Sequence, residues 1–365
     1  MPERARIGIL SRHAVPNYGS VLQACALQWA LEDLGYDACY LNYRLFRDQP
    51  LAAARRESGL PAALLRSIPK AVSENRFESM RKRLLSQTSV VHTGDELRTL
   101  SGAFDALCVG GDQVWNVLSD GAVDGAYLLD FADADIPRFS YASSLGSGRI
   151  AESDRERFST ALSHFDRVSV REVSGVEALA GIGIDSTVVV DPVHLFSVET
   201  WEKRIPFAAP KGLEPGNFIL VYNLHPDDEF RSYLGETLDG SPVPVVSIRP
   251  TLRGSYGRNV FYPEPGEFLW MFRNARCVYT DSFHGTAFSL LFDTPFVEWV
   301  PETNNDRNLS LLSTYGLLDR VAQRLPAGAA TRMDGRWEDV NERLAERRAD
   351  STRFLAEAVR EIAPS

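Results

Sequence analysis

One stretch of the chain, residues 279–287 (YTDSFHGTA), places a histidine among small and hydroxyl-bearing residues. The apolar run Cys277–Tyr279 predicts a buried strand, Asp281-Ser282 are residues that begin helices, and Ala287 to Phe292 continue as a helix. Such a strand-to-helix turn directs backbone N–H groups and the positive end of the helix dipole to the carboxyl end of the strand, where anions bind. His284 inside this turn can carry charge toward a phosphate or carboxylate, or pass a proton near neutral pH.

Two other segments end in side chains that could bind a ligand or take part in catalysis. In residues 104–116 an apolar run leads into two glycines and then into polar and aromatic groups. Asp112 there could accept a hydrogen bond from a sugar hydroxyl, act as a base or simply cap a helix, and Trp115 could stack on a sugar face. Arg171, at the end of a predicted strand, is suited to a bidentate grip on phosphate or carboxylate, or to a salt bridge with Glu172 or another acid.

The pattern of the first forty or so residues predicts the secondary structure that would position these side chains. A strand over 6–10, a loop over 11–20, a helix to Leu34 and a strand over 38–43 form the strand-helix-strand opening of a doubly wound sheet. The loop has neither GxGxxG nor the lysine of a phosphate loop, so the nicotinamide and ATP fingerprints are missing. Gly19 permits close approach of a ligand to the backbone, and Asn17 is the expected helix cap.

Strand-helix alternation along the rest of the chain predicts two α/β domains, each large enough for its own core. A Pro- and Gly-rich segment separates them, and the chain ends in a charged amphipathic helix that we expect to pack across the domain junction. The predicted parts are residues 1–207, with a basic helical insertion at about 46–86; a linker over 208–216; a second domain over 217–335; and the terminal helix over 336–365.

Composition indicates an ordinary soluble protein. Of the 365 residues 44% are hydrophobic and 24% are charged, no run reaches the length of a membrane span, and the N-terminus lacks the order of a secretion signal. We therefore expect a cytoplasmic protein. The four cysteines (Cys25, Cys39, Cys108 and Cys277) lie in apolar contexts without CxxC spacing, which favours reduced, buried thiols over disulfides or zinc.

The net charge of −10 disfavours nucleic acid as a partner, because phosphate backbones are bound through clustered positive charge. The segment between Arg44 and Arg83 departs from this balance, with ten Lys or Arg against four acids. It could be a solvated helical face, a basic lid over an anionic substrate, or a peripheral contact surface for an anionic membrane leaflet.

Five motifs in order resemble those of the polysaccharide pyruvyl transferase family, over roughly residues 6 to 320. This resemblance implies two Rossmann-like domains arranged as in glycosyltransferase-B enzymes with a cleft between them. It also implies transfer of a pyruvyl group from phosphoenolpyruvate to two sugar hydroxyls as a ketal, with release of phosphate. The motifs are Asn17-Tyr18-Gly19-Ser20-Val21-Leu22-Gln23, Gly110-Gly111-Asp112-Gln113-Val114-Trp115-Asn116, Val170-Arg171-Glu172, Asp191-Pro192 and Asp281-Ser282-Phe283-His284-Gly285.

On the family pattern Arg171 and His284 match positions associated with the donor. We expect the turn of Ser282, Phe283, His284, Gly285 and Thr286 to bind it with Arg171, and Asp112 to join Arg171 and His284 in catalysis. No metal or other cofactor is expected, since carboxylates with ligand spacing are not evident and phosphoenolpyruvate enters as a co-substrate. Residues expected to line the cleft or face the acceptor are Asn17, Tyr18, Gly19, Gln23, Asp112 and Trp115.

Two departures from the family pattern concern the acceptor. Gly111 stands where many relatives have serine, and Cys25 where an aromatic residue is common. The acceptor could be a free sugar, a polymer, a lipid-linked oligosaccharide or a glycosylated metabolite. Two other functions stay open: a nucleotide-sugar glycosyltransferase of the same architecture, with Glu264 or Glu267 on the ribose, and a non-catalytic sugar-binding relative.

Overall fold

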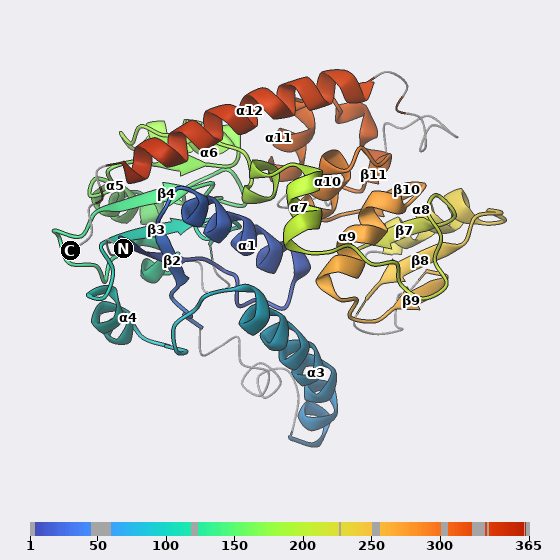
Figure 1. Cartoon of the computed structure of the whole chain (residues 1–365), viewed down its shortest axis with the longest axis horizontal. Coiled ribbons are helices and arrows are strands. Elements are labelled where there is room, and N and C mark those ends of the chain that lie inside the picture. The colour runs from blue at the N-terminus through green and yellow to red at the C-terminus, as the bar shows by residue number, and fades with distance from the viewer. Residues whose placement is uncertain are drawn as a thin grey trace. The chain divides into compact units, whose positions relative to one another are not determined.

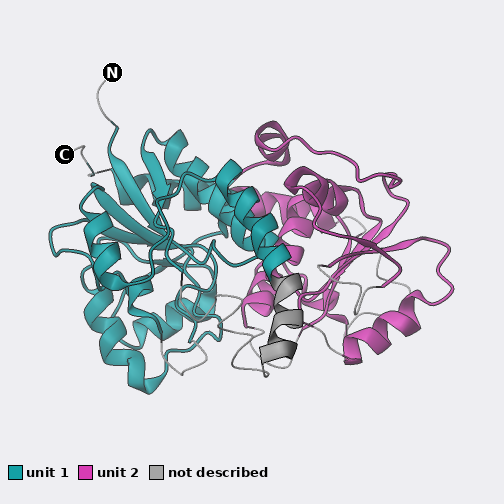
Figure 2. Ribbon diagram, turned by 90° about the horizontal axis from the view of Figure 1, so that it is seen from below, with its two compact units in different colours: residues 1–195, 346–365 teal, residues 196–345 magenta. Residues whose placement is uncertain are grey.

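The computed structural model describes residues 4–44, 60–117, 123–225, 228–249, 256–300, 306–322, 333, 336–360 and 362, with side chains excluded over 60–70. The chain forms two compact units, each built on parallel β-sheet (Figure 2). Unit 1 comprises Met1–Leu195 and Glu346–Ser365, and unit 2 comprises Phe196–Ala345. The predicted α/β class is confirmed. The division falls before α7 (Val198–Arg204), so the predicted linker over 208–216 lies inside unit 2.

Unit 1 is organised around a four-stranded parallel sheet in the order β2-β1-β3-β4, of which Figure 1 labels β2, β3 and β4. Strands buried on both faces of a parallel sheet read as continuous apolar runs, which is why the sequence revealed them. The chain goes from β1 to β2 on one side and then returns to add β3 on the other, so the carboxyl ends of β1 and β3 form a topological switch point, where α/β sheets bind ligands. The strands are β1 Arg6–Leu10, β2 Asp37–Tyr40, β3 Ala106–Gly110 and β4 Arg138–Tyr141, with a second pair β5 Ser169–Val170 and β6 Thr187–Val188.

The predicted first helix is confirmed as α1, Tyr18–Asp33, and Asn17 is its cap: the Asn17 side chain accepts hydrogen bonds from the amides of Gly19 and Ser20. Most of α1 is buried. The remaining helices of unit 1 are α3 Leu60–Leu84, α4 Gly94–Ser101, α5 Arg155–Leu162 and α6 Val173–Ala180, with 3₁₀ turns at Gly125–Leu128, Glu152–Asp154 and Pro192–Leu195.

Unit 2 repeats the plan with a five-stranded parallel sheet in the order β11-β10-β7-β8-β9. Here the chain passes from β7 through β8 to β9 and then returns to the other side of β7 with β10. The carboxyl ends of β7 and β10 are therefore the switch point of unit 2. The strands are β7 Ile219–Tyr222, β8 Val245–Ile248, β9 Arg258–Val260, β10 Cys277–Thr280 and β11 Phe296–Glu298. The helices are α7, α8 Asp228–Leu238, α9 Pro265–Asn274, α10 Phe283–Leu291 and α11 Asp306–Thr314, with a 3₁₀ turn at Leu318–Arg320.

The predicted terminal helix is α12, Arg336–Val359, whose residues up to Ala345 belong to unit 2 and whose later residues belong to unit 1. In unit 1 the hydroxyl of Ser351 accepts a hydrogen bond from the Val190 amide, and the Arg348 guanidinium donates to the His194 carbonyl. Its apolar stripe is buried at Phe354, Leu355 and Val359.

All four cysteines are free and buried, as predicted. Burial raises the pKa of Cys277 to about 12 and raises those of the other three thiols as well, so the thiolates are disfavoured. Within the described part of the chain, every helix is too short or too polar to cross a bilayer.

Candidate functional site

The turn at the start of α10 is built as the sequence predicted. Ser282 has an extended backbone and caps the helix, accepting a hydrogen bond from the Gly285 amide at 3.4 Å. The Thr280 hydroxyl accepts from the Ser282 amide at 3.0 Å and donates to the Tyr222 carbonyl of the neighbouring strand at 2.7 Å. A Cβ on residue 285 would lie 2.2 Å from the Thr280 oxygen, so the turn requires a glycine there. The turn therefore sits at the switch point of unit 2.

His284 occupies the first turn of α10 and is 5% exposed, with its Nε2 buried. Its ring meets Phe283 edge-on at 5.4 Å, and the Arg307 guanidinium lies 5.9 Å from the Phe283 ring. The Thr286 hydroxyl donates a hydrogen bond to Glu298. We expected the backbone amides of this turn to bind the anionic donor molecule. The amides of Gly285 and Thr286 instead donate to the hydroxyl and the carbonyl of Ser282. Thr286 and Gly285 thus shape the turn around His284.

Asp281, just before the cap, has a role that the sequence analysis missed. Its carboxylate accepts hydrogen bonds from the Asn223 side chain at 3.0 Å and from the amides of Leu224 and His225 at 2.7 and 2.8 Å, and it pairs with Nδ1 of His225 at 3.1 Å. The Arg249 guanidinium donates to the Asn223 side-chain oxygen. Asp281 therefore ties the loop after β7 to the turn after β10, and a local pattern could not reveal a pairing so distant in sequence.

Glu298 is the second group that the sequence analysis missed. It ends β11 opposite Thr280 in the sheet register and is fully buried. Thr286 and the Asn308 amide both donate to its carboxyl group. Burial raises the pKa of Glu298 to about 8 in spite of these two donors. Near neutral pH this group is mostly an uncharged acid beneath the first turn of α10.

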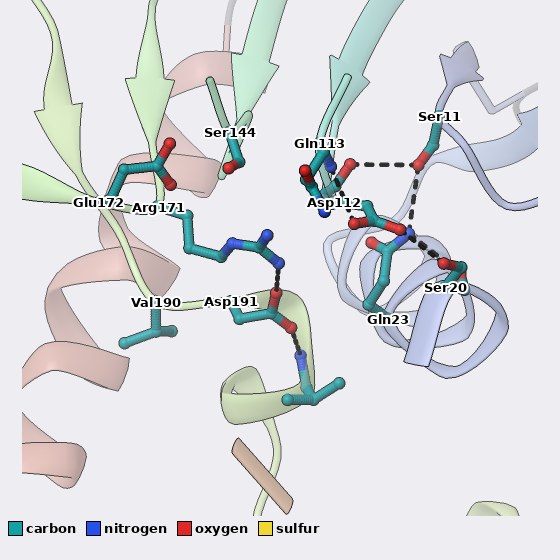
Figure 3. Close-up of polar contacts among 12 residues, drawn as sticks. Ser11, Ser20, Gln23, Asp112, Gln113, Ser144, Arg171, Glu172, Val190 and Asp191 are labelled. Carbon is teal, nitrogen blue, oxygen red and sulfur yellow. Dashed lines mark hydrogen bonds and ion pairs between the residues drawn. The ribbon is translucent and has the colours of Figure 1, made fainter. Parts of the chain in front are cut away.

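In unit 1, Arg171 follows β5 and pairs with Asp191: Nη1 lies 2.6 Å from Oδ2, and both side chains are at most 2% exposed (Figure 3). The salt-bridge alternative therefore holds, with Asp191 as the acid. Glu172 instead accepts a hydrogen bond from the Leu145 amide at 2.7 Å. The ion pair joins two of the five motifs, and it fixes the orientation of the guanidinium at the carboxyl end of β5.

Asp112 lies at the switch point of unit 1 in the left-handed region, with φ of 62°. Its carboxylate accepts from the Ser20 hydroxyl at 2.5 Å and from the Gln113 amide at 2.9 Å (Figure 3). Asp112 is therefore not a helix cap; it connects the loop after β3 to the first turn of α1. Gln23 joins this cluster by donating to the Ser11 hydroxyl at 3.2 Å and to the Ser20 carbonyl.

The expectation that Trp115 faces the acceptor is wrong. Its side chain is 1% exposed in the hydrophobic core of unit 1, the indole N–H donates to the Tyr127 carbonyl at 2.9 Å, and the ring meets Phe158 edge-on. Tyr18, also expected to line the cleft, is 4% exposed and packs against Phe77 of α3. These aromatic residues of the motifs stabilise the loops that carry Asp112 and Asn17.

Two arginines of the basic segment form ion pairs with glutamates of the same segment. The fully buried Arg81 guanidinium lies 2.5 and 2.9 Å from the carboxylates of Glu74 and Glu78 and donates to the Ala14 carbonyl in the loop after β1. Arg44 pairs with the same two glutamates. The solvated-face, lid and membrane-surface alternatives stay open for the other basic residues, because residues 45–59 and the side chains of 60–70 lie outside the described residues.

The predicted site residues thus form clusters at two switch points and at the end of β5. Arg171 and Asp112 belong to unit 1 and His284 to unit 2, so convergence of Arg171 and His284 on one donor remains a prediction. Among the residues that the structure describes, no group of three His, Cys, Asp or Glu side chains is arranged to hold a metal ion.

Comparison with known families and structures gives the relationships of the chain. The family model for polysaccharide pyruvyl transferase matches residues 17–302, which is most of the chain. No curated protein matches the sequence.

Several solved structures are similar over nearly the whole length. A glycotransferase of kitacinnamycin has a TM-score of 0.53 at 14% identity, and S. aureus MnaA solved with UDP has 0.54 at 11%, each with all of both chains covered. The UDP-GlcNAc 2-epimerase of Neisseria meningitidis, bound to UDP-GlcNAc, has 0.52 at 11%, covering 98% of this chain and 100% of the other. At such identities the likeness shows the fold alone, which is that of glycosyltransferase-B enzymes and epimerases.

Proposed function

We propose, from the premise that the chain belongs to the polysaccharide pyruvyl transferase family, that it transfers a pyruvyl group from phosphoenolpyruvate to two hydroxyls of a sugar or glycan. The product is a pyruvate ketal, and phosphate is released. The observation that carries this proposal is the Ser282-capped turn, which holds the motif histidine His284 at the switch point of unit 2.

The chemistry asks for groups of the kinds found in these clusters. The donor is a small anion with a phosphate and a carboxylate, and ketal formation protonates its methylene carbon and passes through a cationic C2 centre. Arg171, oriented by Asp191, would hold the phosphate or carboxylate, and His284 would contact the same anion. Asp112, which accepts a hydrogen bond from the Ser20 hydroxyl at 2.5 Å, would also accept one from an acceptor hydroxyl and so orient it for attack. No metal or cofactor takes part in this scheme.

The direct test is mass spectrometry of candidate glycans incubated with the protein and phosphoenolpyruvate, read for the mass gain of a pyruvate ketal. Arg171→Lys and His284→Asn should abolish the gain while the protein stays folded. Arg157→Lys is the matched control, because Arg157 also pairs with an aspartate, Asp130, but in a half-exposed position. Ketal formation that survives both site variants would refute the assigned roles.

A nucleotide-sugar glycosyltransferase is the second candidate, favoured by the similarity to MnaA solved with UDP and to the epimerase bound to UDP-GlcNAc. Its predicted ribose partners have another function here: Glu264 and Glu267 form the capping box of α9, and the Glu267 carboxylate accepts from the Glu264 amide at 2.8 Å. Thermal shift with phosphoenolpyruvate and with UDP-GlcNAc separates the two. Stabilisation by UDP-GlcNAc alone would favour the glycosyltransferase, and binding of a glycan without turnover would favour the non-catalytic relative.

A further inference from the structure

The loop after β7 is folded around a single carboxylate. Asp281 is 1% exposed at its side chain and accepts hydrogen bonds from three groups of Asn223, Leu224 and His225 besides the imidazole of His225. A buried carboxylate with this many donors is held in one orientation. The loop therefore fixes the position of the carboxylate oxygen that faces the His225 ring.

The pairing also determines how His225 presents itself. A carboxylate can only accept, so Nδ1 carries a proton toward Asp281, and Nε2 is the nitrogen directed away from it. The His225 side chain is 68% exposed, whereas His284 is buried with its Nε2 covered. Of these two histidines, His225 is the one that can exchange protons with solvent or with a ligand between turnovers.

The Asp281 carboxylate stabilises the protonated form of the His225 ring. The hydrogen bond to Asp281 raises the pKa of His225, and partial burial and the positive charge of Arg307 oppose that rise. Arg249, whose guanidinium donates to Asn223 in the same loop, adds a further positive charge to this edge. These groups come from the ends of β8 and β10 and from α11, so two arginines and the Asp281 carboxylate surround the loop that carries His225.

The position is that of a functional group. His225 and Asp281 follow β7 and β10, which form the switch point of unit 2, and Asp281 directly precedes the Ser282 cap of the His284 turn. An anion drawn to this edge by Arg249, Arg307 and the start of α10 would meet an imidazolium with its outward-facing Nε2–H.

We propose that His225, positioned by Asp281, is the acid that protonates the donor; this inference rests on the proposed pyruvyl transfer. The C2=C3 electron pair of phosphoenolpyruvate takes the proton from Nε2 to form the methyl group, which leaves an oxygen-stabilised cation at C2. A sugar hydroxyl bonds to C2 and returns its proton to Nε2. Phosphate then leaves with the C2–O electron pair, the second hydroxyl bonds to C2, and its proton leaves with the phosphate.

The test uses the full chain, the acceptor found in the ketal screen and three variants: His225→Gln, Asp281→Asn and, as control, His164→Gln. His164 is another exposed histidine, on unit 1. His225→Gln should lower kcat by about 100-fold or more and remove the alkaline limb of the pH–rate profile, while phosphoenolpyruvate still raises the melting temperature. Asp281→Asn should move that limb to lower pH, and His164→Gln should leave rate and profile unchanged.

A second measurement does not depend on turnover. In the wild-type protein the His225 ring resonances should titrate above the ordinary histidine pKa, should shift when phosphoenolpyruvate is added, and should titrate lower in Asp281→Asn. A His225→Gln enzyme with the wild-type rate and the same alkaline limb would overturn the inference while leaving pyruvyl transfer intact. If the wild-type protein forms no ketal with any acceptor, the proposed function fails, and a His225 resonance that ignores phosphoenolpyruvate would sink the inference as well.

Discussion

The buried acid Glu298 offers a prediction that needs no substrate. Replacing it with glutamine removes the ionisable group and keeps its size and its hydrogen bonds, because a side-chain amide can both accept from Asn308 and pair with the Thr286 hydroxyl. The variant is therefore a permanently neutral mimic of the protonated acid. It should fold like the wild-type protein at low pH and differ from it only where Glu298 would have to ionise.

The magnitude follows from the displaced pKa. Burial raises the pKa of Glu298 from 4.5 to about 8, and each pKa unit corresponds to about 1.4 kcal/mol. Because the folded state holds the proton more tightly than the unfolded chain, this stabilisation is fully present below pH 4.5 and is lost as the pH rises toward 8. Between pH 5 and pH 8 the wild-type protein should lose about 3.5 kcal/mol of unfolding free energy that Glu298→Gln keeps.

The assay is thermal unfolding of both proteins from pH 5 to pH 9, with the difference in melting temperature read at each pH, since a two-unit chain need not unfold in one step. For a unit of this size the difference should grow by roughly 10 °C across the range. Glu236→Gln, which changes an exposed glutamate of the same unit, should show no such growth. A difference between wild type and Glu298→Gln that is the same at pH 5 and pH 8 would falsify the argument.

Three further predictions concern unit 1. Gly111→Ala should lower the unfolding free energy by about 1–3 kcal/mol or more, because φ is 63° and a Cβ would lie 1.7 Å from the Gln23 oxygen; urea titration measures this, and Gly102→Ala is the control at an ordinary φ. Trp115→Ala should cost about 3–5 kcal/mol in the same titration and leave phosphoenolpyruvate affinity of the folded fraction unchanged; an affinity loss without destabilisation would restore a ligand-facing role. Arg171→Met and Asp191→Leu should each destabilise by about 3–5 kcal/mol, and the double change should destabilise less than either single change; additive losses in this double-mutant cycle would contradict the strength of the pair.

Local chemistry explains what the sequence could predict. Asn17 was predicted as a helix cap, and Asp281-Ser282 as residues that begin a helix, because a short polar side chain before an apolar periodic segment acts within three residues. The cap at Asn17 is confirmed, and of the pair Asp281-Ser282 it is Ser282 that caps α10. The central strands were recognisable as apolar runs. The short edge strand β9, half exposed and followed by no apolar pattern, was not predicted.

Contacts between residues far apart in the sequence could not be predicted, because these rules act only over a few residues. Asp281 was identified only as a residue that begins a helix, although its carboxylate acts on a loop more than fifty residues earlier. Trp115 was placed in a crevice because it follows Asp112, but the left-handed backbone at Asp112 turns the chain, and sequence spacing after such a turn does not predict direction. Glu298 could not be singled out from the sequence, since only the packing of α10 and α11 over it creates the burial that raises its pKa.

The aspartates of the family motifs share one structural role, which is to hold a neighbouring group in place. Asp112 is bonded to the Ser20 hydroxyl, Asp191 to the Arg171 guanidinium, and Asp281 to the donors of the β7 loop. Each acid therefore works first on its own chain, fixing a hydroxyl, a guanidinium or an imidazole in one orientation. The guanidinium carries a positive charge and the imidazole can transfer a proton, which are the properties that the proposed anionic donor and its protonation would require. Treating each of these aspartates only as a catalytic base would overlook that its carboxylate already positions the group beside it.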